Sequence, residues 1–235
     1  MNPGRGEPDP GAAGFVLAGG QSTRMGIDKA LVELAGKPLV AHTVDVLRDA
    51  GLAGSIVGAR SDLGAFAPVI PDVAVGLGPL SGICAALASP KFQECNAEYG
   101  VFLSVDLPLI PSSLIDYLLR HARITGRVVT LSSVNGFAQT FPVVLDRKAL
   151  PALEAELRCG RGGCFRAFES ASRSLGQALT VLPAEILAQS GQVVHRAALP
   201  PIRWFANLNA PADLLRAEAL MVADAATKLR PSRIA

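Results

Sequence analysis

The chain at residues 13–31 reads AGFVLAGGQSTRMGIDKAL, an apolar run followed by a polar, glycine-rich loop. The apolar run predicts a short buried strand that ends at Gly19 and Gly20. Two adjacent glycines allow backbone N–H groups to approach an anion closely, and Arg24 and Lys29 add two cations to the same loop. This combination predicts a polyphosphate-binding loop. The alternative for the glycines alone is an ordinary strand-to-helix turn with charged residues at the surface.

Two familiar phosphate-binding loops do not fit this segment. A P-loop requires G-x-x-x-x-G-K-[ST], whereas Gly20 and Gly26 are six residues apart and Ile27 follows. A dinucleotide-binding fingerprint requires G-x-G-x-x-G, a spacing that the segment lacks. The sequence therefore argues against a P-loop NTPase and against a dehydrogenase.

Strand and helix patterns alternate along the rest of the chain. The alternation predicts an α/β fold: a single domain with a mostly parallel sheet flanked by helices, Rossmann-like in its layers. We expect the domain to cover residues 14–225, between flexible tails at 1–13 and 226–235. The expected strands are 13–18, 55–58, 69–70, 100–105, 127–132, 140–145, 179–182 and 204–206. The expected helices are 38–50, 78–87, 112–122, 149–157, 164–170 and 211–223.

Two aspartates come directly after predicted strands. Asp72 follows Ile70-Pro71, and Asp106 follows the apolar strand at 100–105. Ligands of open α/β sheets bind beyond the carboxyl ends of the strands, so we expect both carboxylates near the Gly19-Gly20 loop. A carboxylate combined with phosphate oxygens suits Mg²⁺, which makes Asp106 the candidate metal ligand. Asp106 could instead be a helix-capping or turn residue, and Asp72 an ordinary turn residue.

Composition excludes several classes of protein. The 235 residues are 50% hydrophobic, which excludes a disordered chain, and the net charge of 22 − 20 = +2 argues against nucleic-acid binding. No apolar run reaches 18 residues, so no membrane span is expected. The three histidines are scattered, and the four cysteines lack C-x-x-C spacing, which favours unpaired thiols in the cytoplasm. Arg161, among glycines between Cys159 and Cys164, is a hypothetical second anion site.

The loop sequence resembles the L-A-G-G-x-S-x-R-M-G-x-D-K-A-L signature of the MobA family, the molybdenum cofactor guanylyltransferases. Four further segments extend the resemblance to Leu214. They are the strand-end Ile70-Pro71-Asp72, the G-P-L-x-G-I loop at 78–83, the D-x-P segment at 106–108 and the F-x-N-x-N segment at 205–209.

The resemblance implies a nucleotidyltransferase fold, a reaction and a set of residues. The enzyme would transfer GMP from GTP to molybdenum-bound molybdopterin, releasing pyrophosphate and requiring Mg²⁺ held by Asp106. The implied catalytic residues are Arg24, Lys29 and Asp106, and Asn207 and Asn209 would lie toward the pterin. The implied nucleotide-binding residues are Leu17, Ala18, Gly19, Gly20, Lys29, Asp72, Gly78, Pro79, Leu80 and Asp106. A molybdoenzyme or a cofactor-delivery protein is a further expected partner.

Two departures from the family pattern leave alternatives open. Some members carry a nucleotide-contacting Asn in the stretch that here reads Val57-Gly58-Ala59-Arg60, and Ala210 stands where the family has Thr. Base selection is therefore open between GTP and CTP, and a molybdopterin cytidylyltransferase or another small-molecule nucleotidyltransferase is an alternative. A third hypothesis is a non-catalytic nucleotide-binding adaptor for molybdoenzyme maturation.

Overall fold

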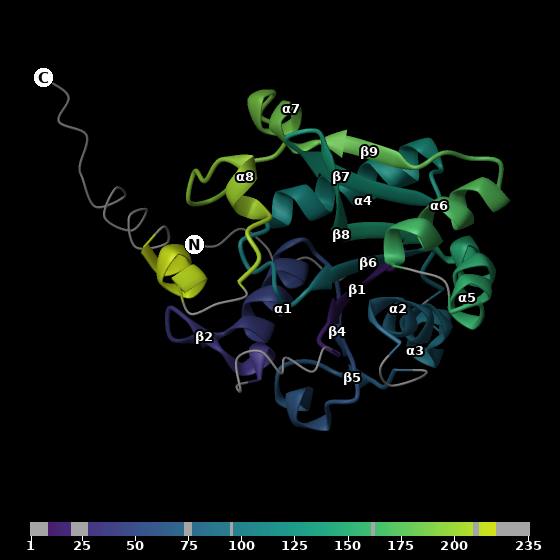
Figure 1. Cartoon of the computed structure of the whole chain (residues 1–235), viewed down its shortest axis with the longest axis horizontal. Helices are drawn as coiled ribbons and strands as arrows, with labels where there is room; N and C mark the ends of the chain where they lie inside the picture. Colours follow the sequence, from purple (N-terminus) through teal and green to yellow (C-terminus); the bar gives the residue numbers. More distant parts are fainter. Residues whose placement is uncertain are drawn as a thin grey trace, which may run out of the picture.

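The computed structural model describes residues 9–19, 28–72, 77–94, 96–160, 163–208 and 212–219. A seven-stranded sheet, in the order β5-β4-β1-β6-β8-β7-β9, forms its centre (Figure 1). The strands are β1 (Ala12–Leu17), β4 (Gly54–Val57), β5 (Val69–Ile70), β6 (Tyr99–Ser104), β7 (Val129–Val134), β8 (Phe137–Asp146) and β9 (Thr180–Pro183). Only β8 runs against its neighbours β6 and β7, and the other pairings in this sheet are parallel. The predicted mostly parallel α/β sheet is confirmed.

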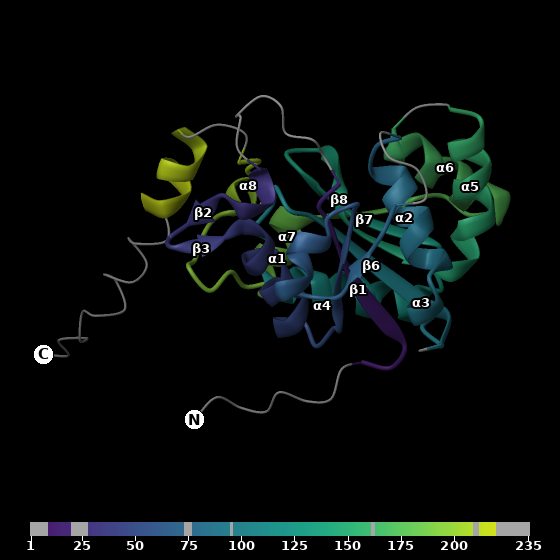
Figure 2. The same ribbon diagram turned by 90° about the horizontal axis from the view of Figure 1, so that it is seen from below.

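Helices cover both faces of the sheet (Figures 1 and 2). The helices α1 (Leu39–Asp49), α4 (Ser112–Thr125), α7 (Ala184–Gln189) and α8 (Pro201–Trp204) contribute to one apolar core. The helices α2 (Pro79–Ala88), α3 (Pro90–Glu94), α5 (Leu150–Arg158) and α6 (Cys164–Ser174) contribute to the core on the other face. In the described part of the chain, packed helices thus cover both faces of the sheet, and the loops lie at the ends of its strands.

The central strands form where the sequence is apolar on both faces. The side chains of Phe15 and Val16 in β1 are buried on opposite faces of the sheet, in different cores. This double burial is typical of parallel strands between two helix layers. On α1 the buried residues are Leu39, Val40, Thr43, Val44 and Leu47, a spacing that places them on one side of a helix.

Several local predictions differ from the structure. β1 starts at Ala12, two residues before the expected domain boundary. The predicted strand at 204–206 is wrong, because Trp204 ends α8 and its indole Nε1–H donates to the Leu199 carbonyl at 2.7 Å inside the core. An aromatic, apolar triplet resembles a strand when only its composition is read. Of the helix expected at 211–223, residues 212–219 are described and helical.

A small hairpin of β2 (Glu33–Leu34) and β3 (Lys37–Pro38) was not predicted from the sequence. Its turn residues Ala35 and Gly36 both have positive φ, the backbone form of a tight hairpin turn. The Ala35 N–H donates to the Glu218 carboxylate at 3.0 Å, so the hairpin contacts the helical residues 212–219.

In the described part of the chain, no helix is long and apolar enough to cross a membrane.

Candidate active site

The carboxyl ends of β1, β4, β5 and β6 meet at one edge of the sheet. Hydrogen bonds continue between the strands beyond their ends: the Ala18 N–H donates to the Val57 carbonyl at 3.0 Å, and the Val105 N–H donates to the Leu17 carbonyl at 3.3 Å. The Gly58 N–H donates to the Ile70 carbonyl at 3.0 Å. The residues that follow these strands are therefore held in fixed relative positions by the sheet itself.

The Asp72 carboxylate lies between two glycines at this edge. A Cβ at Gly19 would be 2.8 Å from Asp72 Oδ2, and a Cβ at Gly82 would be 2.9 Å from Asp72 Oδ1. Burial raises the pKa of Asp72 above its usual value. Among the described residues, no hydrogen bond or ion pair to this carboxylate is found. The structure thus places Asp72 and Gly19 together, as predicted from their strand-end positions.

Lys29 and Asp106 form an ion pair, with 2.8 Å between Lys29 Nζ and Asp106 Oδ2. Lys29 begins the short helix η1 (Lys29–Leu31), and Asp106 follows β6. The Lys29 side chain is 13% exposed and that of Asp106 29% exposed. A cation and a carboxylate thus meet at a partly shielded site where the strands end.

Asp28 and Arg60 lie beside this pair and were given no role by the sequence analysis. One Asp28 oxygen accepts from the Ala30 N–H at 3.1 Å and caps η1, while the other pairs with the Arg60 guanidinium. The hydrogen bond from Arg60 lowers the pKa of Asp28 from its usual value. The signal for Arg60 was its position shortly after β4, at the same edge as the other strand ends.

The turn after β4 requires a glycine. Gly58 has φ +150°, and a Cβ there would lie 3.1 Å from Gly19 Cα and 3.1 Å from Gly19 N. The backbones after β1 and β4 therefore pass in close contact. A side chain at position 58 would force them apart.

The C-terminal segment crosses the end of β6. The Leu208 N–H donates to the Asp106 carbonyl at 3.2 Å. Phe205 and Leu208 are buried, whereas the intervening Asn207 is exposed next to this contact. Of the other predicted residues, Gly78 precedes α2 with φ +73°, Pro79 begins that helix, and the side chain of Leu80 is buried. Gly20, Arg24, Arg161 and Asn209 lie outside the described residues.

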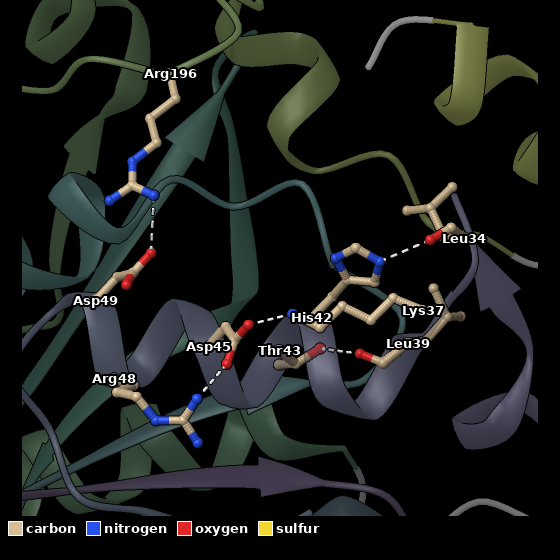
Figure 3. A network of polar contacts seen from close by, with 9 residues as sticks. All are labelled: Leu34, Lys37, Leu39, His42, Thr43, Asp45, Arg48, Asp49 and Arg196. Atoms are coloured by element: carbon tan, nitrogen blue, oxygen red, sulfur yellow. Dashed lines mark hydrogen bonds and ion pairs between the residues drawn. The ribbon is translucent and has the colours of Figure 1, made fainter. Parts of the chain in front are cut away.

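A polar network on α1 holds the hairpin that follows Lys29 (Figure 3). His42 Nε2 donates to the Leu34 carbonyl at 2.8 Å, and Asp45 pairs with both Lys37 and Arg48. Burial lowers the pKa of His42 from its usual value, which favours the neutral ring. In the part of the chain that the structure describes, no group of three or more His, Cys, Asp or Glu could hold a metal ion. The hydrogen bond from His42 helps to fix the hairpin against α1.

The family model of the MobA-like NTP transferase domain matches residues 14–175. The chain belongs to this family. It is 32% identical over 216 residues to a molybdenum cofactor guanylyltransferase of Rhodobacter capsulatus, covering 88% of this chain and 94% of the relative. It is 35% identical over 151 residues to a molybdenum cofactor guanylyltransferase of Pseudomonas putida, covering 62% of this chain and 76% of the relative.

A solved structure of similar fold is the molybdopterin-guanine dinucleotide biosynthesis protein A of Archaeoglobus fulgidus. It has a TM-score of 0.69 at 22% identity and covers 90% of this chain and 99% of that one. The family membership makes this MobA-like protein a nucleotidyltransferase, and enzymes of this kind normally use a divalent metal ion.

Proposed function

We propose that this MobA-like protein transfers GMP from GTP to molybdopterin, forming the guanine dinucleotide and pyrophosphate. The observation that carries the proposal is the Lys29–Asp106 pair, held at 2.8 Å where the strands end. The names of the relatives supply the substrate class, and the phosphate-binding sequence that contains Lys29 supports it. We place this chemistry in the cytoplasm, which the reduced, buried thiols of Cys84 and Cys164 support.

The proposed reaction requires positioning and charge stabilisation more than proton transfer. A phosphate oxygen of molybdopterin attacks the α-phosphorus of GTP, and the bond from that phosphorus to the bridging oxygen breaks. The nucleophile is already an anion, so no general base is needed. Lys29 stabilises the charge that develops on the leaving pyrophosphate, and Arg24 is proposed to do the same.

The residues around Asp106 fit a magnesium ion. A partly exposed carboxylate oxygen is a hard ligand, and Mg²⁺ typically binds one or two carboxylates together with substrate phosphates. Asp106 would hold this ion, which when bound would neutralise charge on the phosphate oxygens. The carboxylate also pairs with Lys29, so it orients the ammonium group as well.

The nucleoside and the acceptor are assigned to opposite sides of Asp106. Asp72, whose oxygens lie against Gly19 and Gly82, is proposed to accept hydrogen bonds from the nucleoside. The proposed nucleotide-binding backbone comprises Leu17, Ala18, Gly19 and Gly20, with the start of α2 at Gly78, Pro79 and Leu80. Asn207 and Asn209, and Arg161 by hypothesis, are proposed for the pterin side.

Pyrophosphate release tests the proposal directly. Purified protein is incubated with Mg²⁺, molybdopterin and GTP, CTP or UTP in turn, and the dinucleotide is identified by mass spectrometry. We expect release with GTP, loss of release in Asp106→Ala, and normal release in Asp116→Ala, a carboxylate on the exposed face of α4. Preferential use of CTP would support the cytidylyltransferase alternative. GTP binding without pyrophosphate release would support the adaptor.

A further inference from the structure

A chain of charged contacts links the turn after β4 to the Lys29–Asp106 pair. We propose that Arg60 is a positioning residue, which holds Lys29 against Asp106 by fixing Asp28. This inference rests on the role proposed above for Lys29. Arg60 itself is given no contact with either substrate.

Successive contacts connect Arg60, which follows β4, to Asp28 and then to the turn that begins at Lys29. The planar Arg60 guanidinium uses its fork of N–H donors on two carboxylates: it pairs with Asp28, and its Nε–H donates to Asp62 Oδ1 at 2.9 Å. The hydrogen bond from Arg60 lowers the pKa of Asp28, and a guanidinium is always charged, so the pair stays charged near neutral pH. The remaining Asp28 oxygen caps η1 at Ala30, one residue beyond Lys29.

Arg60 can serve as an anchor because its own backbone is fixed. Its N–H donates to the Gly58 carbonyl at 2.9 Å, and its carbonyl accepts from the Leu63 N–H at 3.1 Å. Gly58 in turn lies against the Gly19 backbone and is bonded to the end of β5. The backbone that carries the guanidinium is thus held by the sheet. η1 is a single short turn whose Ala30 is buried in the core. The Arg60–Asp28 pair adds an anchor on the side of that turn where Lys29 begins.

The partial exposure of the Arg60–Asp28 pair allows a positioning role to be distinguished from a role in folding stability. The Arg60 side chain is 27% exposed and that of Asp28 is 28% exposed, so the pair is still partly solvated, and ion pairs in contact with water contribute at most about 1 kcal/mol to folding. A displacement of a catalytic group by about 1 Å can lower the rate about 100-fold. Loss of the anchor should therefore reduce turnover much more than it reduces the melting temperature.

Pyrophosphate release in variants tests this ordering. We expect Arg60→Gln and Asp28→Asn each to lower kcat about tenfold or more, with a smaller change in KM for GTP. Arg60→Lys should recover part of the loss. Asp62→Asn is the matched control, because it removes the exposed partner of Arg60 and leaves Asp28 in place. An equal loss of kcat in Asp62→Asn would overturn the proposal.

The Lys29→Ala background shows whether Arg60 acts through the lysine. We expect Arg60→Gln to cause almost no further loss of kcat in that background, since the group it positions is gone. A loss as large as in the parent protein would show that Arg60 acts independently, and would overturn the proposal.

A second readout does not depend on activity. The acylation rate of Lys29 by an amine-reactive reagent, measured by mass spectrometry relative to the exposed Lys148, reports how well the ammonium is held. We expect a severalfold faster reaction in Arg60→Gln than in the parent or in Asp62→Asn. If the parent releases no pyrophosphate, the proposed function fails, and this ratio still decides the positioning role. An unchanged ratio would overturn that role.

Discussion

Replacing Gly82 by alanine is expected to disturb the proposed nucleotide site by displacing the Asp72 carboxylate. Gly82 is buried in α2, and a Cβ there would lie 2.9 Å from Asp72 Oδ1, 3.1 Å from Val57 Cγ1 and 3.3 Å from Leu17 Cδ2. The two apolar side chains belong to a packed core. Asp72 presents the end of a side chain at the site and can turn away. We therefore expect the added methyl group to displace the carboxylate first.

Two opposing effects set the change in stability. Alanine is favoured over glycine in a helix interior by about 1 kcal/mol, whereas overpacking of a core costs about 1–3 kcal/mol. The net destabilisation should be about 0–2 kcal/mol, which corresponds to a melting temperature lower by at most about 8 °C in a protein of this size. The fold should therefore survive.

The effect on nucleotide binding should be larger. A hydrogen bond to a charged group contributes about 1.5–3 kcal/mol, so loss of the proposed Asp72–nucleoside contact should raise the Kd for GTP about tenfold to hundredfold. Calorimetric titration measures this Kd, and a thermal melt measures stability in the same samples. Gly64→Ala is the matched control, because among the described residues no atom beyond its chain neighbours lies within 4 Å of the added Cβ.

The double variant Gly82→Ala/Asp72→Ala separates the two contributions. Once the carboxylate is absent, the added methyl group should weaken GTP binding no further. A Kd for Gly82→Ala within twofold of the parent value would refute the assignment of Asp72 to the nucleoside. A further tenfold loss in the double variant would refute the route through Asp72.

Three other predictions follow from the same structure. Lys29→Ala should lower kcat about 10²–10³-fold, or about 3–4 kcal/mol, the scale of one pre-organised electrostatic donor, and near-normal pyrophosphate release would exclude Lys29 from the mechanism. The Arg123 hydrogen bond lowers the pKa of Asp9, so this pair should stabilise the fold above about pH 4 and lose its contribution as the pH falls through the lower folded pKa. Both side chains are about one-third exposed, so the ion pair should contribute at most about 1 kcal/mol to the free energy of unfolding. The urea midpoints of the parent and of Arg123→Gln should therefore converge at low pH. A difference that stays constant with pH would contradict the assignment of this stability to the Asp9–Arg123 pair. Exposed Cys159 should react with a thiol reagent in the native protein while buried Cys84, whose pKa burial raises to about 12, should not; mass mapping that finds Cys84 modified first would contradict the packing.

The outline of the fold was predictable because it depends on local patterns. Apolar runs with turn residues between them indicated the strands, and helical spacing of residues such as Val40, Val44 and Leu47 indicated α1. An Asn135-Gly136 pair, typical of tight hairpins, marked the β7–β8 turn, where both residues have positive φ. This signal was present in the sequence and was not used. The reversed direction of β8 was not predicted.

The sequence by itself determined which residues stand at the ends of strands. Because parallel strands end at one edge, the residues after β1, β5 and β6 had to lie along the same edge of the sheet, which predicted Gly19, Asp72 and Asp106 on the side of the loop before Lys29. The family signature within residues 17–31 depends on the same local order of residues. Strand-end position could not distinguish a ligand-binding carboxylate from an ordinary turn residue.

The tertiary structure alone decided which charged groups meet. The pairing of Arg60 with Asp28, and of Lys29 with Asp106, joins residues far apart in the chain. A side-chain ion pair depends on distances of a few ångströms, which are set by how loops close across the sheet. Surface charges have no periodicity that would reveal a distant partner. Hydrophobic burial therefore specified the sheet from the sequence, whereas the geometry of the proposed site became apparent only once the chain had folded.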